Sequence, residues 1–302
     1  LSVVEALQNE IRELRSAKPA SDASVIPLVR GFNGDPKGAS SVDIPWQKGF
    51  ARIGGGDEVR PTLFKAFHDN DWLYVAVACS EPELMEMVRK TPRHRPDAHA
   101  IYVAPCVEIN IDPSGTGLSF YKVAVSCQGD VVDCFCEDDN MGTRTFTYDS
   151  RHESGAVARA LADKASWGVE VAIPLGPLVA RGAADKWGFS IARNRPFPDR
   201  SKAPEASAWP AGLDGFNRPD EFARVSLQDF RKDAHAFELA LGTAKVTRGK
   251  DGLDVALTAT VANRTDDFRA LRLKATLKDA NGNVLADTVS ALEPCRRNLR
   301  TS

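Results

Sequence analysis

Strict alternation of apolar and polar side chains constrains this sequence more than any other feature. Residues 106–112 read CVEINID and residues 119–126 read SFYKVAVS, with a Gly-containing loop between them. A period of two residues places alternate side chains on opposite faces of a β-strand, whereas a helix needs a period near 3.6. The two segments therefore predict a β-hairpin with one apolar face and one mixed face.

The same alternation recurs between turn-forming Gly, Pro, Asp and Asn residues. Further segments of this kind lie at 62–69, 72–80, 131–137, 168–174 and 187–194. Helical spacing in this region is confined to residues 81–90. Many short strands joined by short turns are typical of an antiparallel β-sandwich, so we expect an all-β fold over residues 25–232.

The chain has two further parts. Residues 3–16 have apolar side chains at helical spacing, and the polar, Pro-containing stretch that follows has linker composition. A second group of alternating segments includes a DANGN hairpin turn and predicts a partial immunoglobulin-like sandwich. About four of its strands are visible, so we expect the chain to be part of a longer polypeptide. The expected domains are 1–24 (N-terminal helix and linker), 25–232 (β-sandwich) and 233–302 (partial immunoglobulin-like β domain).

Charge and hydropathy exclude several classes of partner. The 39 Lys and Arg residues nearly balance the 41 Asp and Glu residues, which gives a net charge of −2 at pH 7. Nucleic acids and anionic membranes require a basic footprint. The longest apolar stretches, such as 72–79, fall far short of the roughly 20 residues that cross a bilayer. We therefore expect a neutral or small partner, with no nucleic acid and no membrane.

The cysteines fit no zinc motif. Cys134 and Cys136 form a C-x-C pair, but no second pair with histidine follows at a suitable distance. Free cysteine is among the most frequently buried residue types. We therefore expect buried thiols in strands, with a disulfide framework as the alternative. The six are Cys79, Cys106, Cys127, Cys134, Cys136 and Cys295.

Parity divides the expected strands into two faces. One face is apolar and would form the core: Leu73, Val75, Val77, Val107, Ile109, Ile111, Tyr121, Val123, Val125, Val169, Val171, Ile173, Trp187, Phe189 and Ile191. The opposite face is small and sparsely polar: Ala76, Ala78, Glu108, Asn110, Lys122, Ala124, Ser126, Glu170, Ala172, Ser190, Ala192 and Asn194. Small residues leave space above a sheet, so this face predicts a shallow hollow. The alternative is that a helix or loop covers it.

Three polar residues of the small face form a candidate sugar site. Glu108 offers an acceptor, Lys122 a cationic donor and Asn194 an amide, a combination that suits the vicinal hydroxyls of a saccharide. The aromatic residues in irregular segments around it are Tyr102, Trp209 and Phe216. A ring stacked on the apolar face of a pyranose contributes on the order of 1–3 kcal/mol. Tyr102 alternatively begins a strand, and Trp209 alternatively fills the core.

Five ordered segments of this chain resemble a known family. They are FHDNDWLYVAVACSEPE, CVEINIDPSGTGLSFYKVAVSCQGDVVD, WGVEVAIPLGPL, WGFSIARNRP and SAWPAGLDGFNRPDEFARVSL. Their order and spacing resemble the family 9 carbohydrate-binding modules and their DOMON-like relatives, over about residues 25–230. The resemblance implies a non-catalytic β-sandwich that binds oligo- or polysaccharide, as an accessory module of a polysaccharide-degrading enzyme or a surface protein. It also implies an extracellular or periplasmic location and further domains of the same polypeptide as partners.

The resemblance assigns roles to individual residues. The two stacking rings fall on Tyr102 and Phe216, where the sugar-binding relatives have tryptophan, so stacking should be weaker here. The sugar-bonding glutamate falls on Glu108, and the amide near Asn194. The neighbouring basic residue falls on Lys122, in place of arginine. Pro105 further replaces a family aspartate that could pin a loop or bind calcium.

No cofactor is expected, and two alternatives have candidate ligands. Loop carboxylates suit calcium, and the candidates are Asp112, Asp130, Asp138 and Asp139. A DOMON-like electron carrier would bind haem through Met85, Met87 or His94.

Two other functions stay open at this point. Glu108 and Glu170 share the parity of the small face, and a glycosidase needs two carboxylates roughly 5 to 10 Å apart. No nucleophile elbow, phosphate loop or zinc-protease motif accompanies them, so we expect no catalytic activity in this chain. The other alternative is an orphan structural or interaction sandwich that has lost its ligand.

Overall fold

A computed structural model describes most of the chain. The residues described are 25–58, 60–90, 100–138, 145–149, 152–197, 203–235, 237–241, 245–248, 253–256, 259–263, 269–278, 281, 283–295 and 300–301. The helix expected at 3–16 lies outside them. The chain divides into two compact units, Leu1–Val179 with Ala183–Phe230 and Ala180–Gly182 with Arg231–Ser302.

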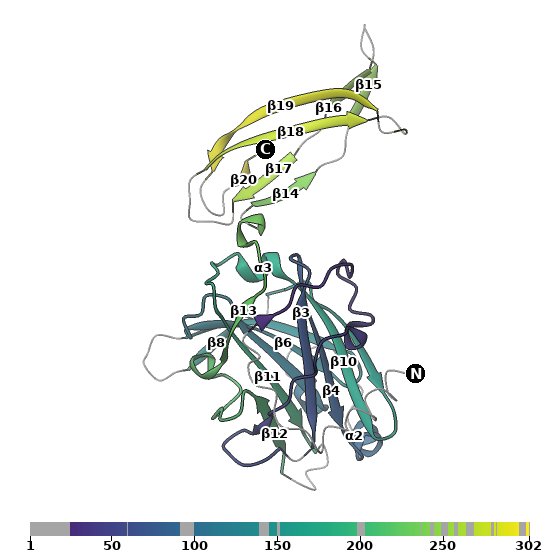
Figure 1. The fold of residues 1–302 in the computed structure, drawn as a ribbon, viewed down its shortest axis with the longest axis vertical. Helices are drawn as coiled ribbons and strands as arrows, with labels where there is room; N and C mark the ends of the chain where they lie inside the picture. The colour runs from purple at the N-terminus through teal and green to yellow at the C-terminus, as the bar shows by residue number, and fades with distance from the viewer. Residues whose placement is uncertain are drawn as a thin grey trace. The chain divides into compact units, whose positions relative to one another are not determined.

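The first unit is a β-sandwich of two sheets (Figure 1). The large sheet has the order β1-β13-β11-β5-β6-β7-β8, and β12 joins β11 to β2. Its strands are β1 (Val25–Ile26), β2 (Ala51–Arg52), β5 (Cys106–Asp112), β6 (Ser119–Ser126), β7 (Val131–Asp138), β8 (Phe146–Asp149), β11 (Trp187–Arg195), β12 (Glu205–Trp209) and β13 (Ala223–Leu227). The small sheet has the order β3-β4-β10-β9, with β3 (Thr62–His68), β4 (Trp72–Ser80), β9 (Val157–Ala162) and β10 (Ser166–Pro174). The prediction of an all-β sandwich is confirmed.

Helices are few and short. The described residues contain α2 (Leu84–Lys90) and α3 (Leu175–Val179), with 3-10 turns η1 (Ala39–Ser41), η2 (Ala100–Val103), η3 (Pro219–Glu221) and η4 (Lys232–His235). Among these elements, no helix has the length and apolar character needed to span a membrane.

The core lies between the two sheets. All fifteen residues assigned to it by parity belong to one apolar cluster. Ile109 of β5 pairs with Val123 of β6 on one side and with Ile191 of β11 on the other, and all three are fully buried. Burying an aliphatic side chain of this size contributes about 1.5–3 kcal/mol, so this interface supplies the main driving force for the fold.

The residues of opposite parity do not form a single face, so the expected common hollow is wrong. Glu108, Lys122 and Asn194 lie on the outer face of the large sheet, whereas Ala76 and Glu170 lie on the outer face of the small sheet. Alternation within a strand cannot show to which sheet the strand belongs. The two carboxylates considered for catalysis therefore lie on different sheets.

Both outer faces are covered by the chain itself. The segment before β2 packs Ala39 and Trp46 against Ala76, Ala78 and other residues of the small sheet. On the large sheet, the segment after β12 packs Leu213, Phe216 and Phe222 over Ala192 and Ala208. These alanines are no more than 1% exposed. The alternative that a loop covers the small residues is thus the correct one.

Glu170 shows how a covering segment is fixed. Its carboxylate accepts hydrogen bonds from the Ser40 amide at 3.0 Å, the Ser40 hydroxyl at 2.6 Å and the Gly38 amide at 3.2 Å. Arg159 adds an ion pair at 3.5 Å. Because a buried carboxylate is costly unless it is hydrogen-bonded, these contacts make Glu170 an anchor for η1.

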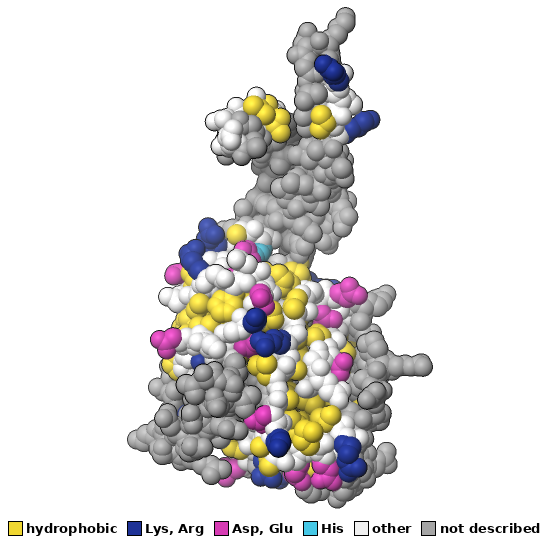
Figure 2. Space-filling model, turned by 90° about the vertical axis from the view of Figure 1, so that its right-hand side faces the viewer, with side chains coloured by type: hydrophobic (Ala, Val, Ile, Leu, Met, Phe, Trp, Pro, Cys, Tyr) yellow, Lys and Arg dark blue, Asp and Glu magenta, His cyan; other side chains and the backbone are white. Residues whose placement is uncertain are grey.

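The face of the molecule in Figure 2 carries charges of both signs, interspersed among the described side chains. No patch of one sign forms over the described residues on that face.

The second unit contains three separate groups of strands among its described residues. They are β14 (Phe237–Leu241), β17 (Ala259–Asn263) and β20 (Arg300–Thr301), then β15 (Lys245–Arg248) with β16 (Leu253–Ala256), and β18 (Arg269–Lys278) with β19 (Val284–Cys295). The pairing of β18 with β19 is antiparallel and ends at Lys278 and Val284, on either side of the DANGN stretch. The expected hairpin is therefore present.

A buried charge network ties the two sheets together at one end of the sandwich. Arg193 of β11 donates to Glu81 and to the Ser80 carbonyl, at 2.9 and 2.8 Å. Arg195 also donates to Glu81, at 2.9 Å, and pairs with Glu205. Glu81 is fully buried and Arg193 is 1% exposed. Since Glu81 follows β4, this network links the small sheet to the large one.

Glu81→Gln should lower the free energy of unfolding of the sandwich by about 3 kcal/mol, because it leaves two buried guanidinium groups without their shared carboxylate. Urea unfolding followed by tryptophan fluorescence measures this in the first unit, which holds all five tryptophans. They are Trp46, Trp72, Trp167, Trp187 and Trp209. Glu83→Gln is the matched control, since the Glu83 side chain is 30% exposed and should cost less than 1 kcal/mol. Equal losses in the two variants would contradict this role.

The partly buried carboxyl group of Glu58 should make the free energy of unfolding depend on pH. Burial raises its pKa to about 7, although the charge of Arg193 and the hydrogen bond from the Thr62 amide oppose the shift. The folded state then binds more protons than the unfolded state between about pH 4.5 and 7, so stability should fall as the pH rises through this window. Glu58→Gln should remove this slope and raise stability above pH 7, on the order of 1 kcal/mol. Unfolding midpoints at pH 5 and pH 8 measure it, and a slope unchanged in the variant would refute it.

Candidate functional site

A buried ion pair lies at the centre of the outer face of the large sheet. Lys122 Nζ is 2.5 Å from Glu108 Oε2, and the side chains are 5% and 3% exposed. In the strand register Asn110 lies opposite Lys122 and Ala124 lies opposite Glu108. The small Ala124 leaves room for the lysine to lean diagonally toward Glu108. Burial lowers the pKa of Lys122, but the charge of Glu108 and the hydrogen bond to it together raise the pKa above its ordinary value, so the lysine stays charged.

Hydrogen bonds connect this ion pair to the surface. Lys122 Nζ donates to Asn217 Oδ1 at 2.9 Å, and Asn217 Nδ2 donates to Tyr148 Oη at 2.6 Å. Asn217 precedes η3, and Tyr148, on the edge strand β8, is 52% exposed. We call Lys122, Asn217 and Tyr148 the amide bridge. Through this bridge the buried charge of Lys122 is connected by two hydrogen bonds to the exposed hydroxyl of Tyr148.

Two of the expected rings lie on this outer face. Tyr102 packs beside Cys106, Ala124 and Val132, whereas Phe216 packs in a neighbouring apolar cluster. Both rings are partly buried. Burial and then the nearby charge of Glu108 raise the pKa of Tyr102 well above its ordinary value. The structure thus places Tyr102 within electrostatic reach of the ion pair and Phe216 next to Asn217 in the chain.

Asn194 has a local role in this structure. Its Nδ2 donates to the Tyr102 carbonyl at 3.2 Å. The bond joins β11 to η2, and Asn194 pairs with Cys106 of β5 in the register. Its amide therefore holds the segment that carries Tyr102.

Trp209 does not lie with the other five expected site residues. It pairs with Ile191 in the register, so its side chain points to the inner face of the sheet. There its ring is 4.9 Å from the ring of Phe64 and 6.2 Å from that of Phe189. The alternative that Trp209 packs into the core is the one the structure supports.

The five cysteines of the sandwich are thiols in this structure. Cys79, Cys106, Cys127, Cys134 and Cys136 are free and buried, as expected. Cys134 and Cys136 lie on the outer face of β7 with their sulfur atoms 3.7 Å apart. The hydrogen bond between them lowers the pKa of Cys134 and raises that of Cys136. Lys122 lies directly across from Cys134 in the register, which favours a thiolate there.

Two of the carboxylates considered for calcium lie at opposite ends of β6. Asp112 Oδ1 and Oδ2 accept bonds from Gly115 and Gly117 at 3.0 and 2.8 Å and close the β5–β6 loop. Asp130 accepts from the Ser126 hydroxyl at the opposite end of β6. The described residues contain no group of three or more His, Cys, Asp or Glu side chains arranged for a metal.

The two described candidate haem ligands differ in their exposure. Met85 is 63% exposed and Met87 is 3% exposed, because they lie two residues apart on α2 and point to different sides. His94 and Asp139 lie outside the described residues.

Comparison with solved structures finds sandwiches of similar extent. A Bacteroides uniformis protein described as a proposed carbohydrate-binding protein is 15% identical, with a TM-score of 0.49, over 68% of this chain and 97% of that one. A family 9 carbohydrate-binding module from Caldicellulosiruptor kristjanssonii, in complex with glucose, is 16% identical, with a TM-score of 0.42, over 68% and 96%. The same kind of module in complex with cellotriose is 15% identical, with a TM-score of 0.43, over 70% and 95%.

No protein-family model matches the sequence, and neither does any curated protein. Identities near 15% and TM-scores below 0.5 transfer no ligand and no site to this chain.

Sequence reasoning did not single out Asn217 and Tyr148. Asn217 directly follows Phe216 in GLDGFNRPDEF, and an amide beside a loop ring is a signal that could have identified it. Tyr148 lies in the short edge strand FTYD, where alternation over four residues is too brief to detect.

Removing one member of the Glu108–Lys122 ion pair should lower the free energy of unfolding strongly, whereas replacing both members with apolar residues should change it little. Lys122→Met should lower the free energy of unfolding by about 3–5 kcal/mol, because the Glu108 carboxylate stays buried without its partner. The double variant Glu108→Leu with Lys122→Met should regain most of that loss. Urea unfolding by tryptophan fluorescence compares the single variants with the double one. Additive losses would mean that the two charges are not coupled.

Proposed function

We propose that the first unit is a non-catalytic carbohydrate-binding module, with its sugar site on the outer face of the large sheet. The observation that carries the proposal is the amide bridge, in which a buried lysine donates to Asn217 and Asn217 donates to exposed Tyr148. A buried ion pair is weak evidence for stability, because an apolar pair of similar volume is often as stable. The Glu108–Lys122 pair instead has a positioning role, because Lys122 holds Asn217 by a hydrogen bond.

The amide bridge has unused hydrogen-bonding capacity for a sugar. An amide oxygen has two lone pairs and an amide nitrogen has two hydrogens, and Asn217 uses one of each within the bridge. The Tyr148 hydroxyl can also accept or donate further. Two donors and two acceptors at adjacent positions therefore remain, and they suit two neighbouring hydroxyl groups of a pyranose.

In this arrangement Glu108 and Lys122 are positioning residues. Both are too deeply buried to reach a ligand in the present conformation, since they are 3% and 4% exposed. The positive charge of Lys122 polarises the Asn217 amide and makes its N–H groups better donors. Tyr102 and Phe216 supply partly exposed ring surface near the bridge. We assign to the site an affinity of roughly micromolar to millimolar, as expected for a few hydrogen bonds and partial stacking.

The proposed context is an accessory module of a polysaccharide-degrading enzyme or a surface protein, outside the cell or in the periplasm. The ligand class is oligo- or polysaccharide. Support comes from the sequence resemblance of residues 25–230 and from the sandwich that the structure forms there.

A second candidate function is a structural or interaction sandwich without a small ligand. The covering of the outer face favours it, since Ala192 and Ala208 are buried beneath Leu213, Phe216 and Phe222. In this case the ion pair only orders the segment around η3.

Oligosaccharide binding separates the two candidates. A glycan array with the full chain, followed by calorimetry on any hit, should detect a saccharide, and Asn217→Ala should weaken it at least tenfold by removing the hydrogen bonds of the bridge. Phe216→Ala should also weaken it by removing ring contact. Asn281→Ala, an exposed asparagine of the second unit, is the matched control and should leave the affinity unchanged. No hit on any glycan, or full binding by Asn217→Ala, would favour the structural candidate.

A further inference from the structure

The inner side of the large sheet contains a cavity where the sheet divides. The same edge of β11 pairs with β13 over Trp187–Phe189 and with β12 over Ile191–Arg195. The two partner strands diverge between these stretches. A cavity of about 310 Å³ lies at this point, against β3 of the small sheet, and we call it the fork cavity.

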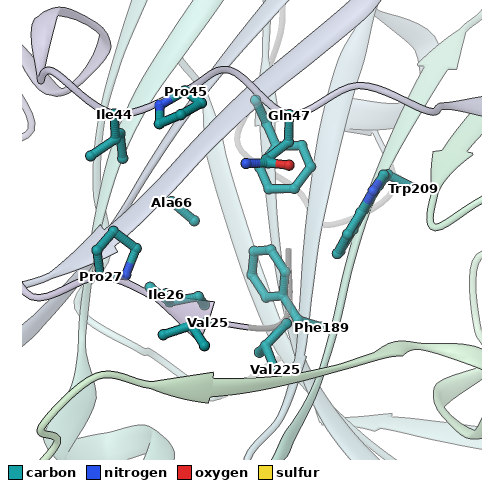
Figure 3. Close-up of a pocket in the computed structure, with 11 residues that line it drawn as sticks. Val25, Ile26, Pro27, Ile44, Pro45, Gln47, Ala66, Phe189, Trp209 and Val225 are labelled. Carbon is teal, nitrogen blue, oxygen red and sulfur yellow. The ribbon is translucent and has the colours of Figure 1, made fainter. Parts of the chain in front are cut away.

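The walls of the fork cavity are apolar and aromatic. Phe189, Trp209 and Val225 line it from β11, β12 and β13, and Phe64 and Ala66 line it from β3 (Figure 3). The rings of Phe64 and Trp209 meet at an interplanar angle of 60°, and those of Phe189 and Trp209 also meet at 60°. Such tilted arrangements leave ring faces and edges available to another ring.

Gln47 is the polar exception among the described lining residues. Its backbone is fixed by a bridge to Phe64, with bonds of 2.7 and 3.2 Å. Its side-chain amide makes no hydrogen bond to any described residue. Figure 3 shows the Gln47 side chain between Pro45 and Trp209 in this view, above Phe189. The Gln47 side chain is partly exposed at the mouth of the cavity, and a ligand in the cavity can supply a partner for its amide.

The size of the cavity limits what can bind. The fork cavity opens to the surface, since Val25 in its lining is 52% exposed. An enclosed apolar cavity of about 150 Å³ takes up benzene in another protein. The fork cavity has about twice that volume, which corresponds to one or two fused rings. Charged or strongly hydrated molecules would lose their hydration on entry, and the side-chain amide of Gln47 alone would not compensate for that loss.

We propose that the fork cavity binds a small planar apolar molecule of one or two rings that carries one hydrogen-bonding group for the Gln47 amide. The three aromatic side chains contact the ring, and the amide selects the polar substituent. This site is independent of the proposed sugar site, because Phe189 and Trp209 face the inside of the sandwich whereas Ala192 and Ala208 face the outside.

Two probes that differ by one hydroxyl group test the proposal on the full chain. 4-Methylphenol and toluene are titrated while methyl NMR signals of Ile26, Ala66 and Val225 are followed. Both probes should shift these signals at saturable, micromolar to millimolar concentrations. Gln47→Leu should weaken 4-methylphenol about tenfold and leave toluene within twofold, because only the phenol loses a hydrogen bond. Gln128→Leu, the same change at an exposed turn, should alter neither affinity.

A cavity-filling variant provides the second arm. Ala66→Leu should weaken both probes at least tenfold while the urea unfolding transition of the sandwich is retained. Absence of saturable shifts in the unmodified chain would overturn the proposal. So would an equal loss of both probes in Gln47→Leu. Nuclear Overhauser contacts from these methyl groups to residues 1–24 would show that the chain itself fills the cavity, and would also overturn it.

Discussion

The apolar interface between the two sheets is the interaction on which the rest of the first unit depends. Most of its residues come from alternate positions of β4, β5, β6, β10 and β11, and Ile109 is fully buried between neighbours on β6 and β11. Once these positions are committed inward, the period of two residues sends every intervening side chain outward. The side chains on the outer faces are therefore determined by the choice of the core positions. Those that are buried need hydrogen-bond or packing partners from the segments that cover the sheets.

Segments of the chain cover both outer faces, and polar residues of the strands hold these segments by hydrogen bonds. Glu170 fixes η1 over the small sheet, Asn194 fixes η2 over the large sheet, and Lys122 fixes Asn217 before η3. Each of these residues sits among small neighbours that let a loop approach closely. A polar group that is buried without a partner is costly, so each attachment is strong and local. The same alanines that suggested an open hollow are the contact surface of the covering segments.

The sequence was informative about the core and about pairs of adjacent strands, because alternation is a local property. It predicted the inward side of Val123 and Phe189 and the β5–β6 hairpin from a few residues each. It could not assign strands to sheets, which is why Glu170 was placed on the face of Glu108. That assignment depends on contacts far apart in the chain, such as the pairing of β11 with β5. For the same reason Asn217 was missed, since its partner Lys122 lies 95 residues away.

Strand β11 connects the two proposed sites through its alternation. Ala192 faces outward beneath the segment that carries Asn217, and Phe189 faces inward at the fork where β12 and β13 separate. In both places an amide on a neighbouring segment supplies the specificity: Asn217 is held by a buried charge, whereas Gln47 is held only by its backbone. The side chain of Asn217 is already hydrogen-bonded and is therefore pre-organised for a polar ligand in water. The Gln47 amide lies at the mouth of an apolar cavity, where a ligand that carries its own hydrogen-bonding atom can pair with it. The two amides therefore favour different ligands, a hydrated saccharide outside the sheet and an apolar ring within it.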